Sequence, residues 1–153
     1  MTDLILNGTV SRDHINLVEA AIKQHPLANQ VDLKYNHIFS DGIYARELFI
    51  PKGTIVVGKI HKFYNLNFMV KGKMEVSVGD EMRIIEAPFH VVSPPNTKRI
   101  ARALEDTIWI TVLRTDETDI DKIEESFTCN SDEEYRLFLE HQEQLKLPLD
   151  LKC

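Results

Sequence analysis

Two side chains in this sequence, Lys59 and His61, have types and a spacing that suit chemistry. In an extended strand, residues two apart point to the same side, so both would face one space. Asn65 and Asn67 follow with the same spacing. Such a group would supply an imidazole for proton transfer, two amides for directional hydrogen bonds and a positive charge, which together suit an anion.

Basic residues are concentrated in the middle of the chain. Residues 51–102 contain nine Lys/Arg against four Asp/Glu. Arginine forks match the geometry of carboxylate and phosphate groups, and aromatic rings such as those of Tyr64 and Trp109 offer stacking surfaces. This concentration of basic residues suits an anion-binding site. The family resemblance given below implies which residues share one cavity, and the candidate ligand contacts are then Lys59, His61, Asn65, Asn67, Lys98, Arg99, Arg102 and Trp109, with His61 also a candidate catalytic residue.

Each candidate also has an ordinary structural interpretation. His61 would equally serve as a partly buried histidine bonded to a backbone carbonyl, and Lys59 as a surface lysine at a strand edge. Arg99 could form a structural ion pair, and Trp109 could belong to the core. For Arg102 the direction of the side chain depends on strand parity, which the sequence leaves open.

Length and charge narrow the classes of function. The 153 residues suit a single domain, and no apolar run reaches the length of a membrane span. Residues 1–114 hold 14 Lys/Arg and 12 Asp/Glu, whereas residues 115–153 hold 4 and 12. The acidic end argues against a nucleic-acid partner. Without a secretory signal pattern, and with Cys129 and Cys153 both late in the chain, we expect a cytoplasmic protein with free thiols.

The hydrophobic pattern divides the chain into three parts. Residues 1–30 contain one predicted helix at 11–25, and residues 115–153 form an acidic segment with two predicted helices. Between them, residues 31–114 predict a β-sandwich or barrel of short strands separated by turn residues. The predicted strands are 44–50, 54–61, 66–70, 73–78, 82–86, 90–92, 99–103 and 108–113.

Capping residues mark where the helices begin. Ser11 is a candidate N-cap for the first helix, which we expect to pack on the barrel or on a partner subunit. The second helix should span 118–127. Ser131 and Glu134 form a capping-box pattern that opens the third helix, and Pro148 should stop it after about residue 145. The side chains that the third helix is expected to bury are Tyr135, Phe138 and Leu139.

Residues 53–72 resemble the first signature of a cupin barrel, a small jelly roll whose interior holds one ligand. With Gly72 aligned to the final glycine of that signature, His61 stands at its second histidine position. Lys59 then occupies the first histidine position and Asn65 the glutamate position. The resemblance therefore implies a cupin fold that has lost most of its metal ligands.

The second cupin signature is altered in the same way. It resembles residues 94–99, where Arg99 stands at the histidine position. An arginine stays protonated and cannot ligate a metal, and a divalent ion beside fixed positive charges would be repelled. We therefore predict neither a metal nor another cofactor.

The chain also resembles, over nearly its full length, a narrower group of small cupin-like proteins found in bacteriophages and their bacterial hosts. In that group, histidines are usual at the positions of Asn65 and Leu104, and no firm biochemical role is assigned. The resemblance implies a bacterial or phage-infected cytoplasm, and pairing of cupins through their sheets implies a homodimer. The matching segments are 44–47, 58–62, 66–67, 93–95, 97–99, 105–109 and 118–124.

Three functions follow from these observations. The leading hypothesis is a cupin without the usual metal site that binds a small anionic molecule, such as a phage-encoded metabolite-binding protein. The second is an enzyme, either metal-dependent through His61 or metal-free and similar to isomerases and epimerases. The third is a virion or assembly protein with a vestigial cavity, acting through its helices.

Overall fold

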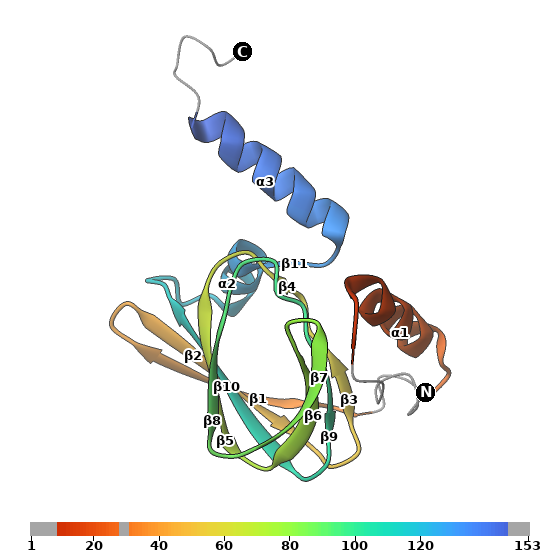
Figure 1. Ribbon diagram of the computed structural model, residues 1–153. Coiled ribbons are helices and arrows are strands. Elements are labelled where there is room, and N and C mark those ends of the chain that lie inside the picture. The colour runs from red at the N-terminus through yellow and green to blue at the C-terminus, as the bar shows by residue number, and fades with distance from the viewer. Residues whose placement is uncertain (1–8, 28–30, 147–153) are drawn as a thin grey trace.

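The computed structural model describes residues 9–27 and 31–146, which form a β-barrel with three helices around it (Figure 1). The prediction of an all-β jelly roll with one N-terminal and two C-terminal helices is confirmed. The helices are α1 (Arg12–Gln24), α2 (Ile120–Phe127) and α3 (Asp132–Lys146). The strands are β1 (Lys34–Ser40), β2 (Ile43–Ile50), β3 (Ile55–Val57), β4 (Ile60–His61), β5 (Asn65–Lys71), β6 (Lys73–Val78), β7 (Glu81–Glu86), β8 (Phe89–Ser93), β9 (Ile100–Ala103), β10 (Thr107–Arg114) and β11 (Thr128–Cys129).

Two antiparallel sheets make up the barrel. One has the order β1-β2-β10-β5-β8 and the other the order β3-β9-β6-β7, while β4 and β11 form a separate pair. The chain crosses repeatedly from one sheet to the other, so strands distant in sequence become neighbours. This winding of eight strands, with β1 added at an edge, is that of a jelly roll.

The strand predictions differ from the structure at three places, one of which is the short β11, which was not predicted. The strand expected at 54–61 is divided into β3, which pairs with β9, and β4, which pairs with β11. In β4, His61 pairs with Thr128 of β11. Strand β1 was not predicted: all of its residues are exposed, so its sequence lacks a clear pattern of alternate burial.

The main core lies between the sheets. Leu48 and Ile50 of β2, Met69 of β5, and Met74 and Val76 of β6 are all buried there. Burial of each such side chain contributes about 1.5–3 kcal/mol. The same residues leave space toward one end of the barrel, where the cavity described below begins.

Helix α1 covers the outer face of the four-stranded sheet. Its Ile15 and Val18 are buried against Ile100 of β9. Ser11 caps the helix, because its side chain accepts a hydrogen bond from the backbone N–H of His14 at 3.1 Å. The helix was expected to pack either on the barrel or on a partner subunit, and in the structure it packs on the barrel (Figure 1).

The C-terminal helices differ in how they meet the barrel. Helix α2 packs through Ile123 against Tyr44 and Leu113. Helix α3 begins as predicted, since the backbone N–H of Glu134 donates to Ser131. It then extends away from the barrel (Figure 1) and buries none of its residues.

The expected burial of Leu139 is therefore wrong. This side chain is 45% exposed, whereas Tyr135 and Phe138 are half-buried near the barrel end of α3. Cys129 is a buried free thiol. Pro148 and Cys153 lie outside the described residues.

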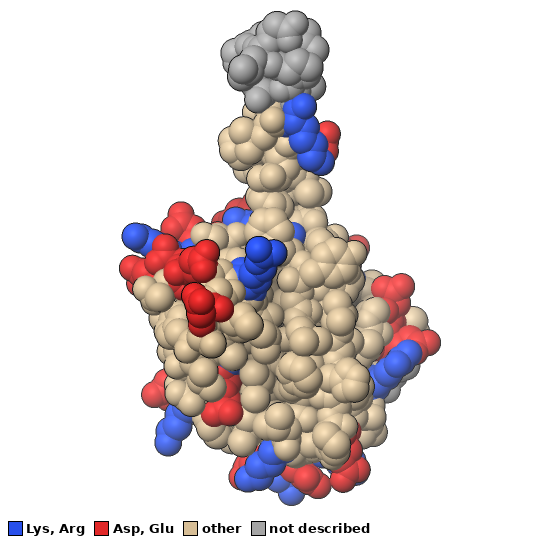
Figure 2. All heavy atoms as spheres, turned by 90° about the vertical axis from the view of Figure 1, so that its left-hand side faces the viewer, with Lys and Arg blue, Asp and Glu red and all other residues tan. Residues whose placement is uncertain are grey.

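The outer face of the five-stranded sheet carries several exposed apolar side chains. Figure 2 shows one side of the molecule, on which charged side chains gather around a broad uncharged area. Pairing of two copies through such a face stays a prediction. The exposed apolar residues of the sheet include Ile38, Phe49, Leu66, Val70 and Val92.

Among the described residues, none of the helices combines the length and apolar character needed to traverse a bilayer.

Candidate ligand-binding cavity

A cavity of about 100 Å³ lies between the two sheets of the barrel. Its floor is apolar and includes Leu48, Met74 and Val76, which belong to the core. Its remaining wall is polar and comes mainly from strands β4, β5 and β10 and from the segment before β9. The structure brings six of the sequence-predicted residues onto this cavity: Lys59, His61, Asn65, Asn67, Arg99 and Trp109.

Arg46 also lines the cavity, although the sequence analysis did not select it. It stands opposite Thr111 in the pairing of β2 with β10. Buried Tyr44 and Leu48 flank it at a spacing of two and point to the same side of the strand. That alternation was the signal in the sequence that would have found Arg46.

The direction of hydrogen bonding along one wall is fixed by Trp109. Its indole nitrogen can only donate, and it lies 3.2 Å from the side-chain oxygen of Asn67. The hydroxyl of Thr111 donates to the same oxygen at 2.8 Å. The amide nitrogen of Asn67 must therefore face the other way. It donates to the side-chain oxygen of Asn65 at 2.7 Å and to the hydroxyl of Ser93 at 2.8 Å.

This chain of amides determines the form of the His61 imidazole. Because the oxygen of Asn65 accepts from Asn67, its nitrogen faces His61 and lies 3.1 Å from Nδ1. A nitrogen that accepts a hydrogen bond carries no proton, so the proton of the neutral ring is on Nε2. The backbone of His61 is held in turn by hydrogen bonds with Thr97 and Asn96. The imidazole thus presents one N–H donor.

His61 remains neutral over the physiological pH range. Burial, together with the smaller effects of the positive charges of Arg46 and Arg99, lowers its pKa from 6.5 to about 4. Protonation would also place a second N–H opposite the amide nitrogen of Asn65, where an acceptor is needed. The ring can therefore donate to an anion without adding charge to the cavity.

Acidification should destabilise the protein through His61. Its pKa is lower in the folded state than in the unfolded state, so between pH 6.5 and 4 the unfolded chain binds the proton and the folded chain does not. The contribution of this group to the free energy of unfolding is highest above pH 6.5 and decreases as the pH falls, by about 3 kcal/mol in total. We expect urea unfolding at several pH values to show this contribution to the slope of the free energy of unfolding against pH in wild type and not in His61→Gln. Equal slopes in the two proteins would contradict the assignment.

The two arginines of the cavity have no acidic partner among the described residues. Arg99 donates to the backbone oxygen of Ser77 at 2.8 Å and to the hydroxyl of Ser93 at 2.7 Å, while Arg46 lies over the ring of Tyr35. Within residues 9–27 and 31–146, neither has a carboxylate at ion-pair distance. Burial lowers the pKa of Arg99. The cavity therefore holds excess positive charge.

The other basic residues predicted for the site are placed differently. Lys59 reaches the cavity wall, but its ammonium group is paired with Glu124 at 2.6 Å. Lys98 is not on the cavity: it is buried beneath α1 and bonded to Asn16 and Glu19. The prediction that Lys98 lies in the cavity is therefore wrong.

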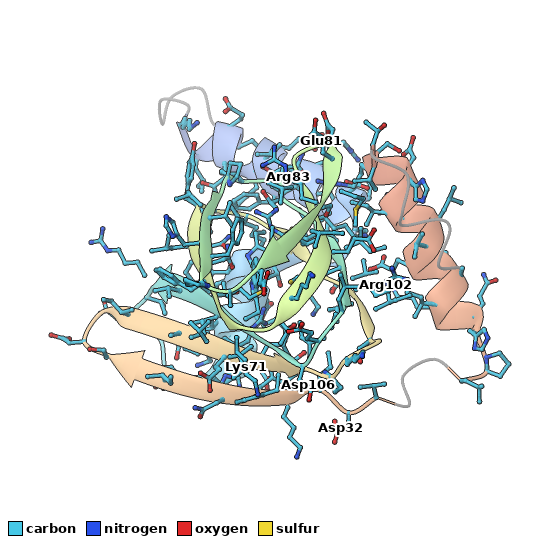
Figure 3. The ribbon with its side chains drawn as sticks, turned by 60° about the horizontal axis from the view of Figure 1, so that its bottom comes forward. Asp32, Lys71, Glu81, Arg83, Arg102 and Asp106 are labelled. Atoms are coloured by element: carbon cyan, nitrogen blue, oxygen red, sulfur yellow. The ribbon has the colours of Figure 1, made fainter. Side chains whose placement is uncertain are left out.

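Arg102 also lies outside the cavity. It pairs with buried Glu75 at 3.0 Å, on the side of the barrel toward α1 (Figure 3). The reason is strand parity, because Arg99 and Ala101 face the cavity and Arg102 must then face outward.

The residues of the cavity do not fit the metal that cupin barrels often hold. His61 is its one imidazole, and the Nδ1 of that ring is already bonded to Asn65. Amides stand in place of carboxylates, and the guanidinium groups of Arg46 and Arg99 would repel a divalent cation. In the described part of the chain, no three His, Cys, Asp or Glu side chains gather as a metal site would require.

Comparison with known proteins gives structural similarity only. No protein-family model matches the chain, and no curated protein matches it either. Among solved structures, KdgF from Halomonas sp. is 18% identical with a TM-score of 0.49, covering 61% of this chain and 92% of that one. A cupin superfamily protein from Desulfitobacterium hafniense is 11% identical with a TM-score of 0.47, covering 58% and 83%. An RmlC-like cupin from Methanocaldococcus jannaschii is 14% identical with a TM-score of 0.46, covering 57% and 84%.

The fold assignment rests on the strand order of the chain itself. Strands β2, β10, β5 and β8 face β3, β9, β6 and β7, and the polar cavity lies between them. An eight-stranded double sheet wound in this way is a jelly roll, the architecture that cupins share. This protein therefore has a jelly-roll barrel with a polar cavity between its sheets.

Proposed function

We propose that this protein binds a small anionic molecule inside its barrel. The observation that carries the proposal is the pair of arginines, Arg46 and Arg99, which line one cavity and lack a carboxylate partner in the described residues. Charged side chains in protein interiors are normally paired, because an unpaired charge out of water is costly. A bound anion would supply the missing partner.

The neutral groups of the cavity support the same ligand class. The Nε2–H of His61 adds a donor without adding charge, and the oxygen of Asn67 is fully engaged by Trp109 and Thr111. Most side-chain groups free to meet a ligand are thus donors. A carboxylate or phosphate offers only acceptors when ionised, so it complements this set.

The volume of the cavity limits the size of the charged group. About 100 Å³ accommodates a carboxylate or phosphate group and little more. Because the floor is apolar, the anion should lie toward the end of the barrel where Arg46, His61 and Arg99 meet.

Anions should stabilise the protein if the proposal holds. We expect inorganic phosphate or acetate to raise the melting temperature in a saturable manner at constant ionic strength, whereas chloride at equal ionic strength should not. A ligand present at about 100 times its Kd adds about 2.7 kcal/mol to the free energy of unfolding. Identical melting curves with phosphate, acetate and chloride would contradict the proposal.

The enzyme hypotheses receive less support from this geometry. A pKa near 4 makes His61 a weak base at neutral pH, and the donor set does not suit a metal. The assembly role and the phage origin stay predictions.

A further inference from the structure

A second chamber adjoins the cavity. It has a volume of about 260 Å³ and lies between the β1–β2 hairpin and α2. Arg46, His61 and Thr111 line both the chamber and the cavity, so these three side chains form a shared boundary. The cavity that contains the arginines and the chamber therefore lie next to each other, with these side chains between them.

One wall of the chamber is aromatic. The rings of Tyr35 and His37 are nearly parallel, with an angle of 6° between their planes, and His37 and Tyr44 are inclined by 18°. The ring nitrogen of His37 lies 2.7 Å from the Tyr44 hydroxyl, which holds the two rings in place. Burial raises the pKa of Tyr44, so its hydroxyl stays protonated at neutral pH.

The wall contributed by α2 is largely apolar. Ile120, Ile123 and Phe127 line the chamber from this helix. A chamber lined by aromatic rings and by apolar side chains suits an apolar ring, whose burial there would remove apolar surface from water. A small polar anion alone would leave most of this space unused.

The charge of the chamber points to where a ligand would place its own charge. Glu124 of α2 lines the chamber and is paired with Lys59 at 2.6 Å. A second negative group on the ligand would meet this carboxylate at close range and be repelled. The positive end of the site is instead at Arg46 and Arg99 in the cavity.

We propose that the cavity and the chamber form one site for an acid that carries a ring. Its carboxylate or phosphate group lies between Arg46 and Arg99, and its aromatic or heteroaromatic ring lies in the chamber beside His37 and Ile120. This inference rests on the proposed function and adds to it the class of molecule that is bound.

Calorimetric titration of the full chain with matched probes tests the inference. Phenyl phosphate is compared with inorganic phosphate, and phenylacetate with acetate, at neutral pH. We expect the ring to tighten binding about tenfold or more in at least one pair, because the ring buries apolar surface. In Ile120→Ala this gain should fall about threefold or more, while binding of the ringless anion stays unchanged.

Ile84→Ala serves as the matched control. Ile84 is an exposed isoleucine of β7 that lines neither space, so its replacement should leave the gain from the ring intact. Nuclear Overhauser contacts between the phenyl protons and the methyl groups of Ile120 would locate the ring directly.

The outcomes separate the two proposals. Equal binding of ringed and ringless anions, with both lost in Arg46→Gln, overturns the inference and leaves the proposed function standing. A gain from the ring that Ile120→Ala does not reduce, without Overhauser contacts to this residue, also overturns it. If none of the four probes binds, the proposed function and the inference both fail.

Discussion

Replacing Arg46 and Arg99 together by glutamine is expected to abolish anion binding while the barrel stays folded. Each arginine would form charge-assisted hydrogen bonds to the ligand, worth about 1.5–3 kcal/mol each, so the double variant should bind at least about 100-fold more weakly. The measurement is calorimetric titration with the anion that stabilises wild type.

Folding should be affected far less, because neither arginine has a carboxylate partner in the described chain that would be left behind. The variant loses the hydrogen bonds of Arg99 to Ser77 and Ser93. At position 46 it loses the placement of the guanidinium group over the ring of Tyr35. We expect a change in the free energy of unfolding within about 2 kcal/mol. Arg114→Gln is the control, since Arg114 is exposed and lines neither space. Unchanged affinity in the double variant would refute the proposed role of both arginines.

The largest loss of stability from a small change is expected at Gly72. This residue joins β5 to β6 with a φ of +98°, and a Cβ built on it would lie 2.5 Å from the backbone oxygen of Asp106 and 2.7 Å from the Cα of Thr107. Gly72→Ala therefore combines an unfavourable φ with a clash against backbone. We expect it to lower the free energy of unfolding by about 3–5 kcal/mol, measured by urea titration.

Gly53→Ala isolates the contribution of the clash. Gly53 has a similar φ of +86°, but nothing lies within 4 Å of a Cβ built there. Its replacement should cost only the conformational strain, about 1–2 kcal/mol. If both variants lost the same stability, the close approach of Gly72 to the β9–β10 turn would have no energetic effect.

Much of the fold was predictable because burial in a jelly roll follows a period of two. Short runs such as 73–78 were located correctly, as were the caps at Ser11 and Ser131. The same rule places Arg46 inside the barrel and Lys98 and Arg102 outside it, once Arg99 is known to face inward. The parity of each strand relative to the cavity was the missing information.

Other features depend on packing that a single sequence does not reveal. Strand β1 has no buried residue, and the chamber exists only because α2 lies against the hairpin that β1 forms with β2. Likewise, the pattern of α3 suits burial of Leu139, but the helix leaves the barrel before that residue can be covered. Such outcomes are decided by contacts between distant segments.

The row of hydrogen bonds that starts at Trp109 and ends at His61 has one direction from donor to acceptor, which the residue types alone do not determine. An asparagine amide can adopt two orientations that exchange its donor and acceptor ends, yet here each amide has a single orientation, set by its neighbour and ultimately by an indole nitrogen that can only donate. The side chain of Trp109, at the far end of the row from His61, thereby determines which nitrogen of the imidazole carries the proton.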